Sequence, residues 1–281
     1  MRSVFLFTNY SKDPGFLESG RVAEIFHSRG IEVLTSAEEW GDKPEYVRCM
    51  PQREAVDRCD IITSLGGDGT ILRVCQVAVE FDKPILGVNL GNIGFMAEIE
   101  RDALERIHTV IDGGYTIDKR MLISGNVKRG EETRFSAAAL NDIVVSRGSA
   151  SRAIELELWN GSHRIANYKC DGIIAATPTG STAYSLAAGG PIVGPDSQNI
   201  VVTPICAHTL YAKSFVFGAD NTINIRRASR EEGVFLTVDG AGGSAVEAGE
   251  TVEIKKSDKL CKLIRLDNFN FYDIINRKLS I

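Results

Sequence analysis

The amino-acid sequence predicts an α/β domain with a mostly parallel sheet, followed by a C-terminal all-β sandwich. Before Thr116, short apolar runs alternate with amphipathic segments, and this alternation is typical of βαβ units. After Thr116, strand-like runs follow one another and long helical patterns are absent, as in β-sandwiches. A length of 281 residues allows two modest domains. We expect an α/β domain over 1–118, a β-sandwich over 119–265, and a C-terminal segment over 266–281 that returns to the first domain.

Apolar periodicity locates the elements of the first domain. Runs of adjacent apolar residues predict strands, and apolar residues three or four positions apart predict helices. Gly30 follows the first helical pattern, at the position where a glycine ends many helices. The expected strands cover 3–8, 31–34, 60–65 and 84–89, and the expected helices cover 16–28, 70–81 and 101–111.

The second half is predicted to consist mostly of strands. Asn160-Gly161 lies between two strand-like runs, which is a strong signal for a hairpin. The segment 172–195 has no charged residue and many Gly, Pro, Ser and Thr, so we expect a buried or ligand-facing loop region with a short helix near 181–188. A helical pattern returns over 267–279. The expected strands cover 121–127, 133–140, 143–146, 153–159, 163–168, 200–204, 214–217, 222–226, 234–238 and 251–255.

Composition and charge exclude several classes of protein. The chain has 32 Lys and Arg against 37 Asp and Glu, a net charge of −5, whereas nucleic-acid binders usually carry a basic face. No run reaches the ~18 apolar residues that a membrane span needs, and the N-terminal apolar run is too short for a signal peptide. We therefore expect a cytoplasmic protein with no membrane or nucleic-acid partner. Its six cysteines are far apart and are expected to be reduced, mostly buried thiols.

Five residues between a predicted strand and a predicted helix, Gly66-Gly67-Asp68-Gly69-Thr70, are the sharpest chemical feature. In open α/β sheets, ligands bind beyond the carboxyl ends of the strands. Glycine lets backbone N–H groups approach phosphate oxygens closely, and a helix N-terminus favours an anion. Asp68 is the one ionisable group, and a carboxylate there can accept a hydroxyl proton in phosphoryl transfer. The alternative is a glycine-rich turn in which Asp68 caps the next helix.

A second cluster combines hydroxyl groups with glycines and lacks charge. It comprises 177–184 and 189–191, and Asp171-Gly172 precede it. Hydroxyls, amides and the Tyr184 ring suit a neutral sugar and an adenine better than a phosphate chain. An exposed Ser/Thr/Gly loop is the alternative interpretation.

Two smaller groups of polar residues are weaker candidates. Asn141-Asp142 directly precede an apolar run, and without other information a turn before a strand explains them. Lys119, Arg120 and Arg147 are interpreted as surface charges, any of which could meet a phosphate.

Other patterns argue against common nucleotide and metal sites. The chain has no Gly-Lys pair and hence no P-loop. The segment 240–245 matches G-x-G-x-x-A, but it joins two strands and opens no helix, so a hairpin loop is expected rather than a dinucleotide site. His208 lacks partners at metal spacing and is interpreted as a structural histidine. No protein-built metal site is therefore expected.

In their order along the chain, these motifs resemble those of the NAD kinase family, in its bacterial form. LGGDGT over 65–70 is shared with lipid kinases, whereas the block DGIIAATPTGSTAYSLAAGGP over 171–191 is far more specific. The other matching pieces are NLGNIGF (89–95), RMLI (120–123), NDIVVSRG (141–148), TPICAHTL (203–210) and VDG (238–240).

The resemblance implies a phosphotransferase. It implies transfer of a phosphoryl group from ATP or polyphosphate to the 2′-hydroxyl of the adenosine ribose of NAD, which gives NADP. Asp68 is then the general base or the partner of that hydroxyl, and Gly66, Gly67, Gly69 and Thr70 form the loop for the phosphate donor. The implied NAD-binding residues are Asp68, Gly69, Asn141, Asp142, Lys169, Asp171, Thr179, Thr182, Ala183 and Tyr184.

The resemblance also implies roles within this set, a metal and an assembly. It assigns Asn141 and Asp142 to adenine and ribose, and Asp171 to the nicotinamide half. A divalent metal, Mg²⁺ above all, is expected to arrive with the donor because no cage of carboxylates is visible. Family members are dimers or tetramers in which one NAD site can draw residues from a neighbouring subunit, so we expect a homodimer or homotetramer.

The chain departs from the family pattern at four positions. Asp142 stands where Glu is usual, and Ala187, Ala207 and Ala241 stand where Ser, Pro and Gln are common. None of these touches Asp68, so activity is expected. Two other hypotheses stay open: a lipid kinase that shares GGDGT, for which no membrane-facing segment is visible, and an NAD-binding sensor that has lost catalysis.

Overall fold

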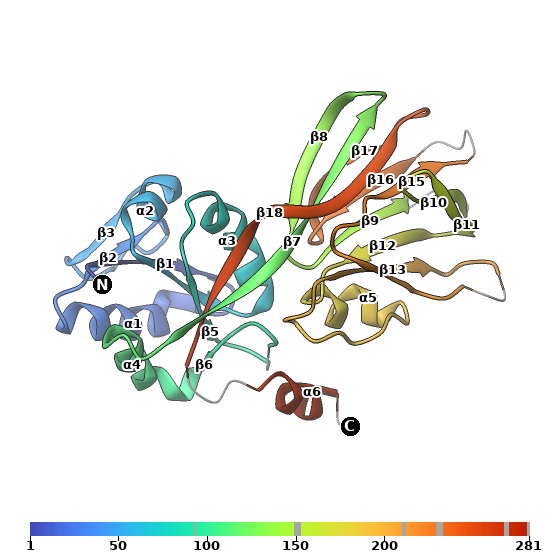
Figure 1. The fold of residues 1–281 in the computed structure, drawn as a ribbon. Helices are drawn as coiled ribbons and strands as arrows, with labels where there is room; N and C mark the ends of the chain where they lie inside the picture. The colour runs from blue at the N-terminus through green and yellow to red at the C-terminus, as the bar shows by residue number, and fades with distance from the viewer. Residues whose placement is uncertain (93, 149–152, 210–211, 229–232, 267–269, 280–281) are drawn as a thin grey trace. The chain divides into compact units, whose positions relative to one another are not determined.

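The computed structural model describes residues 1–92, 94–148, 153–209, 212–228, 233–266 and 270–279, and the chain forms two compact units (Figure 1). Unit 1 comprises Met1–Lys119 and Cys261–Ile281, and unit 2 comprises Arg120–Leu260. Two strands run from one unit into the other, β7 (Thr116–Arg129) and β18 (Thr251–Arg265). The end of β18 and the segment after it therefore belong to unit 1.

Unit 1 is built on a parallel sheet with the strand order β3-β2-β1-β4-β5. The end of β18 lies beside β5, where Leu263 is opposite Ile85. The strand order reverses between β1 and β4, and in such sheets ligands bind at the carboxyl ends of the strands around that point. The bounds are β1 Ser3–Thr8, β2 Glu32–Thr35, β3 Val47–Cys49, β4 Ile61–Gly66, β5 Ile85–Asn89 and β6 Ile99–Glu100.

Helices cover both faces of this sheet, with α1 and α4 on one face and α2 and α3 on the other (Figure 1). Helix and strand side chains share a core in which Phe26, Val33 and Ile107 are fully buried. Each such side chain stabilises the fold by about 1.5–3 kcal/mol relative to exposure. The bounds are α1 Leu17–Ser28, α2 Gln52–Arg58, α3 Asp68–Glu80, α4 Ile107–Ile111 and α6 Phe271–Leu279, with 3-10 turns at η1 Pro14–Phe16 and η2 Arg101–Arg106.

The predicted α/β pattern of unit 1 is confirmed, with differences at the ends of elements. The first helix begins at Leu17 because Phe16 adopts a left-handed φ of 57°. The helix predicted over 101–111 is wrong in its first half, where η2 is a 3-10 turn interrupted by the non-helical φ of −126° at Ala103. No pattern predicts β3, α2 or β6, because elements this short give no periodic signal.

Unit 2 is a sandwich of two sheets over one core, as predicted. In the first sheet β11, β10, β15 and β18 are neighbours in that order, and β7 pairs with β18 and β8. The second has the order β14-β13-β12-β9-β16-β17. Leu156 of the first sheet and Ile173 and Leu236 of the second share the core. The bounds are β8 Glu132–Ala139, β9 Asp142–Arg147, β10 Ile154–Asn160, β11 His163–Cys170, β12 Gly172–Ala176, β13 Asn199–Ile205, β14 Phe215–Gly218, β15 Ile223–Arg227, β16 Val234–Val238 and β17 Ala241–Ala245.

The loop predicted over 172–195 is wrong at its start. Strand β12 occupies Gly172–Ala176 and is fully buried in the middle of the second sheet. Ile173 packs in the sandwich core, whereas Ile174 packs in a second cluster that includes Val193. A strand buried on both faces shows no apolar–polar alternation, which is why the sequence pattern hid it.

Three other predictions in unit 2 are resolved by the strand pairing. The predicted hairpin at Asn160-Gly161 is confirmed between β10 and β11, with Gly161 at a left-handed φ of 56°. The segment 240–245 does form a hairpin, but Ala241–Ala245 is strand β17 paired with β16 rather than loop. Strand β18 runs to Arg265, far beyond its predicted end at residue 255; the prediction stopped short because the middle of the strand carries exposed charged side chains.

The remaining expectations concern short segments and the cysteines. The short helix near 181–188 is η3 (Gly180–Thr182) followed by α5 (Tyr184–Ala187). Within the predicted segments and motifs, Ile93, Leu210, 267–269 and 280–281 lie outside the described residues. Among the described helices, none has both the length and the apolar character to cross a membrane. The cysteines are free as predicted, and four of them are buried: Cys59, Cys75, Cys170 and Cys261.

Candidate active site

The turn over 66–70 lies at the carboxyl end of β4, beside the topological switch point of unit 1. Leu90 N–H donates to the Gly66 carbonyl at 2.7 Å, so the segment after β5 closes on the turn. A Cβ on Gly66 would lie 2.1 Å from Thr70 Oγ1, which excludes larger residues. Helix α3 starts here with Gly67 as its N-cap. The first N–H groups of a helix have no intrahelical acceptor, and this turn is therefore suited to bind an anion.

Asp68 does not cap α3, because its carboxylate is held by the loop that follows β5. Asp68 Oδ2 accepts from Phe95 N–H at 2.8 Å, and Oδ1 accepts from Met96 N–H at 3.0 Å. Gly94 permits this approach, since a Cβ there would lie 2.3 Å from Oδ1. The half-buried carboxylate is thus fixed in one orientation, with lone pairs left to accept from a hydroxyl.

Lys12 lies against the same turn, although nothing in the sequence pattern singled it out. Its Nζ is 2.8 Å from the position a Cβ on Gly67 would take, and 3.1 Å from that on Gly91. The chain after β1 turns back toward β4 here, since Asn9 N–H donates to the Leu65 carbonyl at 2.9 Å and Lys12 N–H to the Asn9 carbonyl at 2.9 Å. An ammonium beside glycine amides is well suited to a phosphate. The one available signal was a basic residue shortly after the first strand.

In unit 2, three segments far apart in the sequence meet at the start of β9. Asp239, in the turn after β16, accepts from the successive N–H groups of residues 140–142 at 2.9, 2.7 and 3.1 Å. Thr177 N–H donates to the Asn141 carbonyl at 2.8 Å. A Cβ on Gly180 would lie 2.0 Å from that carbonyl oxygen, so the loop packs directly on Asn141. The structure thereby brings Asn141-Asp142 and the hydroxyl-rich loop together.

A buried carboxyl group, that of Asp142, and a half-buried one, that of Asp239, lie close to each other at this junction. Asp142 is 5% exposed, and burial together with the nearby Asp239 raises its pKa to about 7. Burial also raises the pKa of Asp239, while its three N–H donors oppose the rise. Asp239 therefore organises the backbone, and Asp142 lies near its titration point at neutral pH.

The hydroxyl-rich loop presents both buried and exposed groups. Thr179 is 7% exposed, and its Oγ1 accepts from Arg120 Nη1 at 3.1 Å. Arg120 is only 2% exposed, so its interpretation as a surface charge is wrong; it is a buried cation that supports the loop. Thr182 Oγ1 donates to the Thr179 carbonyl at 3.2 Å, and Ala183 is half-buried. Tyr184 is 47% exposed, so its ring is open to a partner.

Asp171 and Lys169 are not brought to this group of residues. The last residue of β12 pairs with Asp142, whereas its first residue pairs with Ser146. Asp171 directly precedes β12 and therefore lies about 17 Å from its far end, at about 3.3 Å per residue. There its Oδ1 accepts from Arg147 Nε at 2.7 Å, and Lys169 is exposed on β11.

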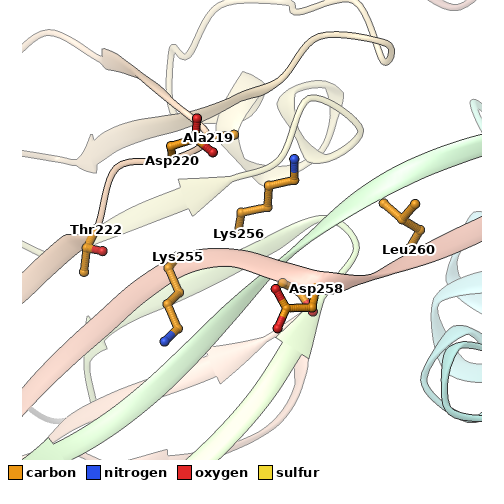
Figure 2. A pocket seen from close by; sticks show the side chains of 8 residues that line it. Ala219, Asp220, Thr222, Lys255, Lys256, Asp258 and Leu260 are labelled. Atoms are coloured by element: carbon orange, nitrogen blue, oxygen red, sulfur yellow. The ribbon is translucent and has the colours of Figure 1, made fainter.

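Unit 2 also has an open polar pocket of about 560 Å³ on β18. Figure 2 shows Lys256 extending toward Asp220, while Lys255 points to the other side of the strand. None of the predicted site residues lines this pocket. It is therefore separate from the candidate nucleotide residues of unit 2.

Unit 1 of this chain has a glycine turn that holds a carboxylate in place, and unit 2 is a sandwich with a hydroxyl-rich loop. A kinase of the GGDGT class combines these two features. Family models match both parts: the ATP-NAD kinase N-terminal domain over residues 22–115 and the ATP-NAD kinase C-terminal domain over residues 140–266. The chain belongs to the NAD kinase family and is an enzyme of that family.

Individual relatives and solved structures agree with this assignment. An NAD kinase of Symbiobacterium thermophilum is 40% identical over 281 residues, 100% of this chain and 99% of the relative. One of Caldanaerobacter subterraneus subsp. tengcongensis is 37% identical over 93% of this chain and 98% of the relative. Yeast NADH kinase complexed with NADH has the same fold, with a TM-score of 0.90, 24% identity, and coverage of 100% of this chain and 88% of that chain. An NAD kinase from Archaeoglobus fulgidus in complex with ATP has a TM-score of 0.79, 23% identity, and full coverage of both chains.

Proposed function

We propose that this enzyme transfers the terminal phosphoryl group of a nucleoside triphosphate to the 2′-hydroxyl of the adenosine ribose of NAD. The observation that carries this proposal is the Asp68 carboxylate, held by two backbone N–H groups at the start of α3. Relatives 37% and 40% identical are named NAD kinase. Neighbours of the same fold were solved with NADH and with ATP.

In the proposed step, the ribose 2′-oxygen bonds to the terminal phosphorus while the bond from that phosphorus to its bridging oxygen breaks. The products are NADP and the nucleoside diphosphate. Asp68 accepts the hydroxyl proton as general base, or holds the hydroxyl in line as its hydrogen-bond partner. Its two N–H donors keep the carboxylate from rotating, and such positioning is a large part of what phosphoryl transfer needs.

The donor phosphates are proposed to bind at the glycine turn. Gly66, Gly67, Gly69 and Thr70 are assigned to this turn, and Lys12 supplies a positive charge against Gly67. Gly67 N–H donates to Thr70 Oγ1 at 3.3 Å and Thr70 N–H donates to the Gly67 carbonyl at 2.8 Å, so these groups hold the shape of the turn. ATP is the favoured donor, and polyphosphate would meet the same turn.

A divalent metal, Mg²⁺ in our proposal, would neutralise charge on the donor when bound. In the part of the chain that the structure describes, no three His, Cys, Asp or Glu residues lie close enough to form a metal site. The protein groups at the turn fit a metal that the phosphates of the nucleoside triphosphate would mainly hold, with Asp68 as the one carboxylate of the turn.

The adenosine half of NAD is proposed to bind in unit 2. Asp142 is assigned to the ribose and the exposed ring of Tyr184 to stacking on adenine. The remaining contacts of this half are assigned to Asn141, Thr179, Thr182 and Ala183.

Asp171 and Lys169 are proposed to serve the nicotinamide half of NAD bound to a neighbouring subunit. Their separation from Asn141 along β12 supports this proposal, because one chain does not bring them to the adenosine residues. The enzyme would then be a homodimer or homotetramer, and we place it in the cytoplasm.

The test is an assay of the purified chain with NAD, ATP and Mg²⁺, in which an NADP-dependent dehydrogenase reports the product. We expect NADP formation that depends on both substrates. NAD binding without NADP formation from any donor would identify a sensor, and phosphorylation of diacylglycerol vesicles in place of NAD would identify a lipid kinase.

A further inference from the structure

The orientation of Asp68 depends on the short loop over 94–98 that follows β5. Both carboxylate oxygens accept from this loop, one from Phe95 N–H and one from Met96 N–H. The loop is irregular up to β6, so no strand ladder fixes these two N–H groups. Whatever holds the loop therefore also holds the carboxylate.

Arg265, at the end of β18, holds one side of this loop. Arg265 Nη1 donates to the Met96 carbonyl at 2.8 Å, and Met96 is the residue whose N–H donates to Asp68. Arg265 is 3% exposed, so water competes little for this contact. Asp68 thus accepts from the N–H group of Met96, while Arg265 donates to the carbonyl of the same residue.

Arg265 is itself fixed by two carboxylates of the same unit. Arg265 Nε donates to Asp118 Oδ2 at 3.1 Å, and Arg265 Nη1 donates to Glu98 Oε2 at 3.3 Å. Glu98 also pairs with Arg106 at 3.5 Å. A planar guanidinium can reach three acceptors in different directions, which a lysine ammonium on a flexible stem reproduces poorly.

Helix α6 holds the other side of the loop through the Phe95 ring. Phe95 clusters with Phe271, Ile274 and Ile275, and the Phe95 and Phe271 ring centroids are 6.2 Å apart. Lys278 Nζ lies 4.2 Å from the centroid of the Phe95 ring. The side chain of Phe95 is thereby packed against the C-terminal helix, while its N–H faces Asp68.

We infer that the C-terminal segment, Arg265 with α6, is a positioning element that sets the orientation of the Asp68 carboxylate through Phe95 and Met96. It touches no substrate; it acts on the reaction by holding the two N–H donors. This inference rests on the proposed function, because it assigns the segment a role in that phosphoryl transfer. Loss of the segment's contacts should therefore lower kcat and leave the KM for NAD nearly unchanged.

The first test is Arg265→Lys in the full-length chain. We expect kcat to fall about 10- to 100-fold, the scale of small misplacements of a catalytic group, while the KM for NAD stays within about threefold. The matched control is Lys262→Ala on the same strand, whose ion pair with Asp82 at 2.6 Å is on the surface. It should retain the wild-type kcat.

Chemical rescue of Arg265→Ala distinguishes a positioning role of Arg265 from a role in folding. In Arg265→Ala, millimolar guanidinium should restore part of the lost kcat, because it can occupy the emptied site between the Met96 carbonyl and Glu98. Methylammonium at the same concentration serves as the control and should restore less. A variant that had merely lost its fold would gain nothing from guanidinium.

The second variant tests the helix. Phe271→Ala should lower kcat by a smaller factor than Arg265→Lys, because the Phe95 backbone stays in place while its ring loses support. Asn276→Ala, at an exposed position of the same helix, should keep the wild-type kcat.

The outcomes separate this inference from the proposed function. If wild-type protein forms no NADP, the proposed function fails first. If it forms NADP and folded Arg265→Lys and Phe271→Ala keep the wild-type kcat, the inference alone is overturned. A rise in the KM for NAD equal to the whole loss of kcat/KM would overturn it as well, since that pattern belongs to a binding role.

Discussion

Asp68 is the first residue of helix α3 in unit 1, and Asp142 is the first residue of strand β9 in unit 2. The two differ in which carboxylate receives the nearby backbone N–H groups. The N–H groups near Asp68 donate to its own carboxylate. The N–H groups near Asp142, including its own, donate to Asp239 instead. Asp142 is therefore buried without those donors, and its pKa rises to about 7. The distribution of backbone donors, rather than residue type, decides what each carboxyl group can do.

The largest effect is expected for Asp68→Asn, which tests whether the Asp68 carboxylate takes part in the reaction. The amide keeps the size of the side chain but cannot take a proton, so kcat should fall by about 10²–10⁴-fold, the usual contribution of a general base. Calorimetry should show NAD binding within about threefold of wild type, since the residues proposed to bind the adenosine half are in unit 2. Asp112→Asn, on the surface of the same unit, is the control. A wild-type kcat in Asp68→Asn would remove Asp68 from the reaction.

The second prediction concerns the pH dependence that Asp142 confers. Its folded pKa of about 7 exceeds the ordinary aspartate value of 3.8, so the folded protein binds this proton more tightly than the unfolded chain does. The associated stability is present below the unfolded pKa and is lost as pH rises through about 7. At about 1.4 kcal/mol per pKa unit, the loss amounts to at most about 4 kcal/mol by pH 8.

Asp142→Asn should remove this dependence. Urea unfolding at pH 5 and pH 8 should give a smaller difference in free energy of unfolding for the variant than for wild type. Glu155→Gln, on a partly exposed position of β10, is the control and should leave the difference unchanged. Identical pH differences in wild type and Asp142→Asn would show that Asp142 is not the responsible group.

Alanine substitutions at Gly180 in unit 2 and Gly69 in unit 1 test how closely the chain packs against each glycine. A Cβ on Gly180 would lie 2.0 Å from the backbone oxygen of Asn141, which cannot move away without breaking the junction. Gly180→Ala should therefore cost about 1–3 kcal/mol or more in free energy of unfolding. A Cβ on Gly69 meets nothing within 4 Å, so Gly69→Ala should stay within about 0.5 kcal/mol. Equal costs in urea unfolding would contradict the described packing.

The last prediction concerns Lys12 and changes a single Michaelis constant. Removing one charge-assisted contact to a phosphate costs about 1.5–3 kcal/mol, so Lys12→Ala should raise the KM for ATP about tenfold or more and leave the KM for NAD unchanged. Lys43→Ala, elsewhere in unit 1, should change neither constant. An unaltered KM for ATP in Lys12→Ala would show that the donor phosphates do not reach this side chain.

Local patterns in the sequence predicted most of the fold, and the failures have physical causes. Alternation of strand and helix identified unit 1, and closely spaced strands identified the sandwich. Strand β12 was missed because it is buried on both faces. Arg120 was assigned to the surface because an arginine is usually exposed, whereas here it is buried and donates to Thr179.

The candidate site was predictable as far as its residues carry distinctive motifs. Glycine-rich and hydroxyl-rich segments are recognisable by composition, so Asp68 and Thr179 were candidates without a structure, whereas Asn141 was a weaker candidate that gained a role only through the family resemblance. Lys12 and Arg265 belong to no such motif. Each is placed by a contact with a residue far away in the sequence, Lys12 against Gly67 and Arg265 on the Met96 carbonyl.

The sequence by itself determined the fold class, the two halves of the chain and the family, because these follow from periodicity and from short motifs whose chemistry is local. Only the tertiary structure decided which carboxyl group receives the backbone donors. It placed Phe95 and Met96 on Asp68 and Asp239 under residues 140–142. Hydrogen bonds between distant segments depend on how the chain packs, and packing is a property of the whole fold.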